Sequence, residues 1–289
     1  MTTTNLAAAP NTAAQSAKKP RKHRRWTSPA TILSLIVLAV AALWALAPGI
    51  FAPEDPYKGV DVALLAPSAE HIFGTDAVGR DLLSRVIFGA RQSLLGALIA
   101  VAVGLVLGTL IGLIAGTQRG WVETVLMRLV DVLLAIPGIL LSLSIIIVTG
   151  FGSLQAAFAV GMTSVATFAR LARSQVIQIA GADFVEAAYG SGATQTQVLV
   201  RHVLPNSLTP VLALAALQFG TAILQLSILG FLGYGAPPPI PEWGLLIAEG
   251  RDFMATAWWL ILLPGLAIVA TVMSANHLSQ VIQQEGDVK

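Results

Sequence analysis

The chain has 289 residues, of which 55% are hydrophobic and only 11% are charged, and its formal net charge is +2. A soluble domain of this size carries about 25% charged residues, so the composition indicates an integral membrane protein. The absence of cysteine excludes disulfides, thiolate nucleophiles and cysteine-bound metals, and the four histidines stand singly, without the spacing of metal ligands.

Six apolar runs are long enough to cross a membrane, since a spanning helix needs roughly 20 mostly apolar residues. The first run lacks a small-x-small cleavage site before Pro48, which favours an anchor over a signal peptide. The uncharged stretch 132–169 is too long for one helix, and Gly150 to Ser153 divide it into two. The predicted spans are 30–47, 93–116, the two halves of 132–169, 208–232 and one within 253–278.

Basic residues predict the orientation, because lysine and arginine stay on the cytoplasmic side. The segment before the first span carries six cations between Lys18 and Arg25. With this segment inside, twelve cations lie inside and five outside, which accounts for all 17. Both termini are therefore expected in the cytoplasm, with 1–29 as a disordered tail. Beside a span, its charge indicates contact with lipid rather than with nucleic acid.

The second predicted span carries small residues at every fourth position, which make a face for close helix packing. Its neighbour is either a helix of the same chain or one of a partner. Proline-glycine pairs at 137–138 and 264–265 predict kinks in the third and sixth spans. The packing residues are Gly104, Gly108, Gly112 and Gly116, extended backwards by Ala100 and Gly96.

The stretch FVEAAYGSGATQTQVLVRHVLPN, residues 184–206, is a polar insert between the fourth and fifth spans, on the cytoplasmic side. Asp183 and Glu186 have the spacing of a capping box, so a short helix is expected to begin at Phe184. Gly190 and Gly192 are expected to end this helix, since glycine tolerates the left-handed conformation.

A second capping box, formed by Thr194 and Gln197, predicts a second short helix. This helix is expected to run to Leu204, where Pro205 stops it. Helices of this length are marginal alone in water, so something must pack against them. The pair is either an amphipathic segment on lipid or a docking element for a cytoplasmic partner.

The chain lacks the residues for several other functions. No Gly-Lys pair occurs, so the phosphate-binding loop GxxxxGK[ST] is absent and ATP would have to bind another chain. Asp131 is the one ionisable residue of the spans and is interpreted as a helix-end charge beside Arg128, which disfavours an ion-coupled transporter or channel. Neither GxSxG nor HExxH occurs, which disfavours a membrane-embedded enzyme.

The polar insert resembles the EAA motif of the membrane subunits of bacterial ATP-binding cassette importers. The match consists of Glu-Ala-Ala at 186–188, three residues, Gly192, nine residues, and His-Val-Leu-Pro at 202–205. His202 replaces the commoner isoleucine, and Tyr-Gly-Ser at 189–191 replaces an Arg-Ala-Leu-like triplet. The resemblance implies coupling to an ATPase through Glu186, Ala187, Ala188, Gly192, His202, Leu204 and Pro205.

Three further segments are similar to the C-type permeases of dipeptide, oligopeptide and nickel systems. They are HIFGTDAVGRDLLSRVIFGAR at 71–91, FLGYGAPPPIPEWG at 231–244 and PGLAI at 264–268. The likeness runs from about Pro29 to Leu278. The tail at 279–284 departs from the family because it lacks the usual GDxLRD ending.

The resemblance implies an all-α permease subunit with six transmembrane helices and no enzymatic activity of its own. It predicts an extracytoplasmic segment at 48–92, a five-helix core at 93–278 with the coupling loop at about 171–207, and a cytoplasmic tail at 279–289. The acidic outer segments, nine acids against five cations, would face a binding protein or simply be solvated.

The resemblance also implies the partners and the place of the chain. These are a second permease subunit, two ATPase domains that hold ATP and magnesium, and an extracytoplasmic solute-binding protein, all at the bacterial cytoplasmic membrane. Peptides are the expected substrate, with nickel or another small solute as the alternative. No substrate-binding residue and no metal site is predicted.

Overall fold

The computed structural model describes residues 28–118 and 120–286, and within these ranges the regular secondary structure is helical apart from one isolated bridge between Thr75 and Asp81. The predicted tail 1–29 therefore lies almost wholly outside the described residues. The elements are α1 (Pro29–Leu46), α2 (Pro48–Phe51), α3 (Leu82–Thr117), α4 (Trp121–Ala135), α5 (Gly138–Thr149), α6 (Ser153–Ala180), α7 (Asp183–Gly190), α8 (Gln195–Val198), a π-turn (Leu199–Val203), α9 (Leu204–Phe231), α10 (Trp243–Gly250), a 3-10 turn (Arg251–Phe253) and α11 (Trp259–Gly286).

Five of the described helices are long and apolar enough to cross a membrane, and a sixth span exists if α4 and α5 are counted together. These two helices meet at an angle of 98°, so the kink predicted at Pro137 is a complete break. Proline lacks an N–H and forces the residue before it out of the helical conformation. Ile136 is extended accordingly, with φ −87° and ψ 128°. The other predicted kink, at Pro264, lies within α11, which passes through it uninterrupted.

The helix α3 begins eleven residues before the apolar run from which the second span was predicted. Asp81 starts it, because its Oδ2 atom accepts a hydrogen bond of 2.7 Å from the Ser84 N–H. The added turns carry Arg85 and Arg91. Hydropathy identified the apolar part of this helix and missed its charged beginning, so residues 82–92 are helix rather than loop.

The glycine face of α3 packs against α6 of the same chain, the most extensive helix pair in the fold. A Cβ atom on Gly108 would lie 2.5 Å from the Val165 carbonyl oxygen, and one on Gly112 would lie 2.5 Å from that of Ala169. Real side chains cannot occupy such positions, so these glycines allow the two backbones to touch. The neighbour left open by the sequence is therefore intramolecular.

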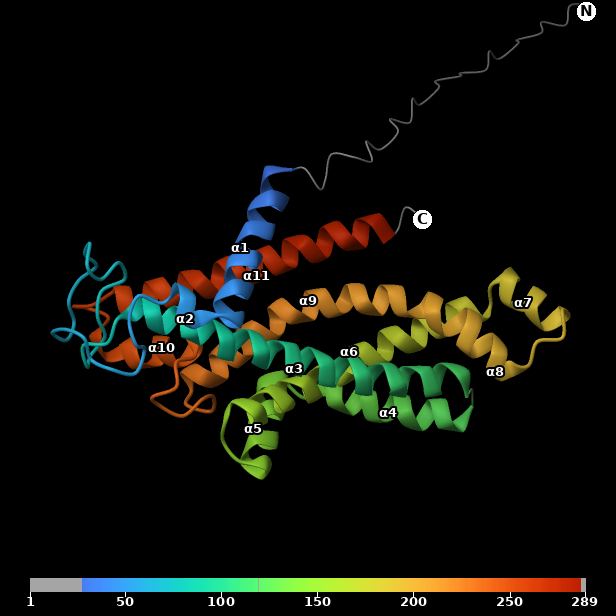
Figure 1. Cartoon of the computed structure of the whole chain (residues 1–289). Coiled ribbons are helices and arrows are strands. Elements are labelled where there is room, and N and C mark those ends of the chain that lie inside the picture. Colours follow the sequence, from blue (N-terminus) through green and yellow to red (C-terminus); the bar gives the residue numbers. More distant parts are fainter. Residues whose placement is uncertain (1–27, 119, 287–289) are drawn as a thin grey trace, which may run out of the picture.

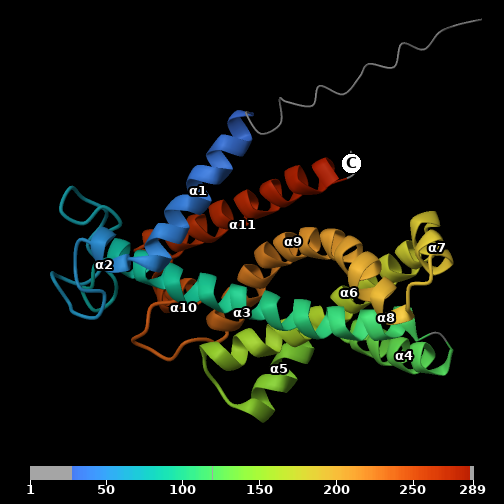
Figure 2. The ribbon, with the colours of Figure 1, turned by 45° about the vertical axis from the view of Figure 1, so that its right-hand side comes forward.

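The long helices separate two ends of the molecule (Figures 1 and 2). Segment 52–81, α2 and α10 gather at one end, here named the loop end. The helices α7 and α8 form a hairpin at the opposite end, here named the hairpin end. The helix α3 runs between them and packs against α1, α6 and α9.

Candidate functional site

The hairpin end holds the polar insert, and its first helix begins differently from the prediction. Ala182 is the N-cap of α7 and makes no side-chain cap. Asp183 is already the first helical residue, so the capping box predicted for Asp183 and Glu186 does not form. Both carboxylates instead lie in the first turn, where the positive end of the helix dipole favours them.

The bend after α7 depends on Gly192, which has a φ of +86°. No atom lies within 4 Å of a Cβ placed there, so the requirement for glycine comes from the backbone conformation. Gly190 has no positive φ and is the last residue of α7. The predicted capping box of α8 is confirmed, because the Thr194 N–H donates to Gln197 at 2.9 Å and the Gln197 N–H donates to Thr194.

Pro205 does not stop the second helix, contrary to the prediction. The helix α8 continues through the π-turn into α9, and one helix spans Gln195–Phe231. The Leu204 N–H donates to the Leu199 carbonyl, five residues back. In a regular α-helix the Pro205 ring would clash with the Arg201 carbonyl, and the wider spacing of the π-turn relieves this clash.

Four buried valines attach the hairpin to the bundle. Val185 of α7, Val198 of α8 and Val203 of the π-turn pack with Val176 of α6. Ala188 is half-buried beside them. Burial of apolar surface is the main force that holds these short helices, since neither is stable alone.

The opposite face of the hairpin is exposed. It carries Glu186, Ala187 and Gly192, and also Tyr189 and Phe184, whose side chains are about half exposed. The Phe184 ring lies 6.4 Å from the ring of His202, which joins the first helix to the π-turn. Of the seven motif residues, the fold brings Glu186, Ala187 and Gly192 to one exposed surface and turns Ala188 inward. His202 lies in the π-turn, and Leu204 and Pro205 lie at the start of α9.

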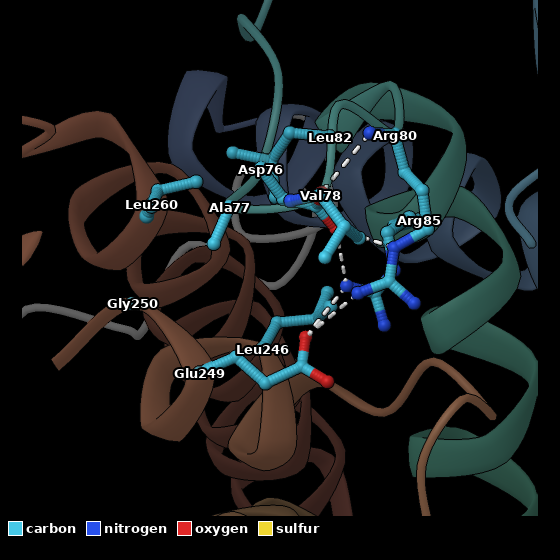
Figure 3. A pocket seen from close by; sticks show the side chains of 10 residues that line it. All are labelled: Asp76, Ala77, Val78, Arg80, Leu82, Arg85, Leu246, Glu249, Gly250 and Leu260. Atoms are coloured by element: carbon cyan, nitrogen blue, oxygen red, sulfur yellow. Dashed lines mark hydrogen bonds and ion pairs between the residues drawn. The ribbon is translucent and has the colours of Figure 1, made fainter. Parts of the chain in front are cut away.

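The loop end holds a charge network that no residue pattern in the sequence indicated. Asp76 accepts hydrogen bonds from Arg80 Nε at 2.6 Å and from Arg85 Nη1 at 2.7 Å. The same Arg85 nitrogen donates to Glu249 at 2.6 Å. Arg85 is completely buried. Figure 3 shows the four side chains converging beside a cavity of about 230 Å³.

Asp81 is buried beneath this network and links α3 to segment 52–81. One oxygen caps α3, and the other lies 3.0 Å from His71 Nδ1. The hydrogen bond with Asp81 raises the pKa of His71, although burial opposes the shift. Burial alone would raise the pKa of Asp76, but hydrogen bonds from the backbone of Arg80 and Val78 and the charge of Arg85 outweigh it, so this pKa lies below its ordinary value.

Glu242 is a second buried carboxylate at the loop end. Burial raises its pKa to about 7, and a hydrogen bond from the Ala236 N–H opposes the shift. Gly230 makes room for it, since a Cβ there would lie 2.5 Å from Glu242 Oε1. The acids of the predicted outer segments are thus not all solvated, because Asp76, Asp81 and Glu242 are inside the fold.

Two ion pairs connect α4 to α6 near the hairpin end. Asp131 pairs with Arg170 at 2.7 Å and is half exposed, so its partner is not the neighbouring Arg128. Glu123 pairs with Arg173, whose Nε lies 2.8 Å from the carboxylate. Asp131 was expected at the inner end of the third span, but α4 begins at Trp121 and Asp131 is the eleventh of its fifteen residues.

Two solved structures show the class of protein that has this helical arrangement. A chain of the MetNI methionine ABC transporter in an inward-facing conformation gives a TM-score of 0.56 at 16% identity, covering 70% of this chain and 97% of that chain. A chain of an amino acid ABC transporter gives 0.57 at 16% identity, covering 71% and 95%. The fold is therefore one used by ATP-binding cassette transporters.

Residues 108–284 match the family described as "Binding-protein-dependent transport system inner membrane component", and the chain belongs to this family. It is 39% identical to a dipeptide transport system permease protein of Alkalihalophilus pseudofirmus, over 89% of this chain and 83% of that protein. It is 38% identical to the glutathione permease GsiD of Escherichia coli, over 93% and 88%. It is 35% identical to the probable D,D-dipeptide permease DdpC of Escherichia coli K12, over 95% and 96%. The resemblance to dipeptide-type permeases is confirmed, and the chain is a membrane-spanning transport subunit.

Proposed function

We propose that the chain forms half of the translocation path of an ATP-driven importer of short peptides in the bacterial cytoplasmic membrane. The second half is a different permease subunit. Two ATPase domains, which hold ATP and magnesium, dock on the hairpin end, and this end faces the cytoplasm. A solute-binding protein delivers the peptide to the loop end, which faces outward.

The observation that carries the coupling role is the two-sided construction of the hairpin. Its inner face is fixed by the four valines, while its outer face presents Glu186 beside Ala187 and the glycine bend. Small side chains permit close approach of a partner, and the carboxylate offers a charge to a basic residue.

The choice of peptides as substrate rests on the relatives, whose names specify dipeptides, D,D-dipeptides and glutathione. Nickel, the alternative from the sequence, finds no comparable support among them. Uptake of a labelled dipeptide by vesicles that contain the complete transporter tests this choice. Uptake that needs ATP and the binding protein and is unaffected by nickel supports the proposal.

The coupling role is tested by reversing the charge of the hairpin and by straining its bend. Glu186→Lys and Gly192→Val are expected to insert and to bind the partner permease normally, but to lose co-purification of the ATPase or its peptide-stimulated hydrolysis. Glu70→Lys is the control for ATPase co-purification, since it reverses an exposed charge at the loop end, away from the hairpin. If both hairpin variants assemble and transport like the wild type, the hairpin is not the coupling element.

A further inference from the structure

The charge network of the loop end joins three parts of the chain that are distant in sequence. Asp76 and Arg80 belong to segment 52–81, Arg85 lies in the first turn of α3, and Glu249 lies on α10. Arg85 contacts both carboxylates through one nitrogen, at 2.7 Å and 2.6 Å. A buried cation is costly unless it is paired, so Arg85 holds the two carboxylates, and the elements that carry them, together.

The two ends of α10 are held in different ways. At its beginning, Trp243 is fully buried against α3, where its side-chain N–H donates to the Val86 carbonyl and its backbone N–H donates to Ser93. At its other end, Glu249 binds Arg85 and lies 3.6 Å from Arg80. The first attachment is the packed side chain of Trp243. The second consists of the contacts of Glu249 with Arg85 and Arg80, here named the polar joint.

The space around the polar joint is incompletely filled. The cavity beside it is lined by Val78, Leu246, Leu260 and the four charged residues. Figure 3 shows Glu249 facing the two arginines across this space. The Glu249 side chain is 28% exposed, whereas Asp76 is 6% exposed. Water therefore reaches the α10 side of the joint.

Segment 52–81 also carries exposed apolar side chains, one of which, Val78, lies beside the joint. Val62, Ile72 and Val78 are each more than 60% exposed. Val78 lies two residues from Asp76 and lines the cavity as well. A protein that pressed on these side chains would move the residues that hold Glu249. The helix α10 in turn packs on α9 and α11, both of them spans.

We propose that Asp76, Arg80, Arg85 and Glu249 form a releasable latch. While Glu249 is bound to Arg85, the latch holds α10 to segment 52–81. Contact at segment 52–81 releases Glu249, and α10 then transmits the change to the spanning helices. The inference rests on the proposed function, because the contact it transmits is the docking of the binding protein. The four are positioning residues: they bind no substrate, and they set whether α10 follows segment 52–81 or moves apart from it.

The charge of the latch is tested in the complete transporter, with partner permease, ATPase subunits and peptide-loaded binding protein. Glu249→Gln keeps the side-chain volume and removes the charge. It is expected to raise hydrolysis in the absence of the binding protein and to lower the stimulation by it about 5-fold or more, the lower end of typical coupling between sites. Asp252→Asn, an exposed acid three residues on, is the control and should change neither quantity.

A second variant opens and closes the latch in one protein. The chain has no cysteine, so Arg80→Cys with Glu249→Cys creates a single reactive pair, and Arg85 remains balanced by Asp76. Without a cross-link this variant should behave like Glu249→Gln. A bis-methanethiosulfonate bridge should abolish stimulation, and a reducing agent should reverse the effect.

The outcomes separate the latch from the proposed function. If the wild-type complex hydrolyses ATP without any response to the binding protein, the proposed function fails and the latch with it. If the wild type responds and both the open and the bridged variants respond equally well, the latch alone is overturned. Loss of stimulation on bridging, with the complex still assembled and restored by reduction, supports it.

Discussion

Different forces attach the two ends of the molecule to the long helices. At the loop end, Arg85 and Asp81 are buried and fixed by hydrogen bonds of 2.6–3.0 Å to neighbouring elements. At the hairpin end, four valines hold α7 and α8, and no described ion pair joins the hairpin to the rest of the chain. Polar bonds have a direction, whereas apolar burial has none.

This difference predicts how each end responds when a partner protein binds to it. The four valines impose no fixed direction on the hairpin, so we expect α7 to adjust its angle to a partner gradually while the valines stay buried. The loop end resists tilting until a hydrogen bond breaks, because a buried charge without its partner is costly. Its response is therefore stepwise, with one arrangement replacing another.

The largest expected effect is loss of the buried cation. Arg85→Met leaves Asp76 and Glu249 to share Arg80, and is expected to lower the free energy of unfolding by about 3–5 kcal/mol, as for other broken buried pairs. Thermal unfolding in detergent measures the change. Arg251→Met, whose ion pair is exposed, should cost no more than about 1 kcal/mol. Equal effects of the two variants would contradict the description of the loop end.

The second effect is a pH dependence that belongs to the loop end alone. Glu242 has a folded pKa of about 7 against an ordinary 4.5, so between these values the folded protein binds more protons than the unfolded chain. The free energy of unfolding should therefore fall as pH rises through this window, by at most about 3 kcal/mol.

In Glu242→Gln this fall should disappear below pH 6.5. His71, whose raised pKa stabilises the fold while the ring is protonated, contributes a fall of the same sign only as pH rises above its ordinary 6.5. Unfolding measured from pH 4.5 to 8 tests both statements. An unchanged slope in the variant would show that Glu242 does not titrate in this range.

The third effect concerns the four buried valines that hold the hairpin. Val185→Ala removes buried methyl groups from α7 and is expected to cost about 1–2 kcal/mol. Hydrogen exchange should rise across 183–203 and stay unchanged at the loop end, since no polar bond is lost. Val200→Ala, at a side chain that is 58% exposed, is the matched control. Faster exchange at both ends would mean that they are not independent.

The smallest effect distinguishes the two glycines of the hairpin. Gly192→Ala forces a side chain into the left-handed conformation and should cost about 1 kcal/mol. Gly190→Ala lies at the helical end of α7 and should be neutral or slightly stabilising. Local exchange of the amides of α8 measures the difference. If the two substitutions behave alike, the bend does not depend on a positive φ.

The sequence predicted those features that depend on neighbouring residues. Apolar runs located the spans, and the spacing of Thr194 and Gln197 located the start of α8. The beginning of α3 was missed because its first turns are charged, and hydropathy reports only the part suited to lipid. Pro205 was misinterpreted because the helix widens to a π-turn, which no residue pattern signals.

The charge network was not predictable for another reason. Arg85 and Glu249 are 164 residues apart, and neither stands in a pattern that names the other. Their contact depends on how α10 folds back over α3, which is fixed by the packing of Trp243. A single sequence shows which residues carry charge, and only the fold shows which charges are removed from water together.

The length of α3 decides what can reach the latch. Its 36 residues make a rod about 54 Å long, whereas the hydrocarbon of a bilayer is about 30 Å thick. The part from Leu82 to Arg91 contains the two arginines of this helix, Arg85 and Arg91, and is about 15 Å long. The uncharged remainder of the helix is by itself longer than the hydrocarbon is thick. With the uncharged part of α3 across the lipid, as the proposed function requires, the joint between segment 52–81 and α10 would lie outside the hydrocarbon, where salt, protons and another protein can reach it from the aqueous side.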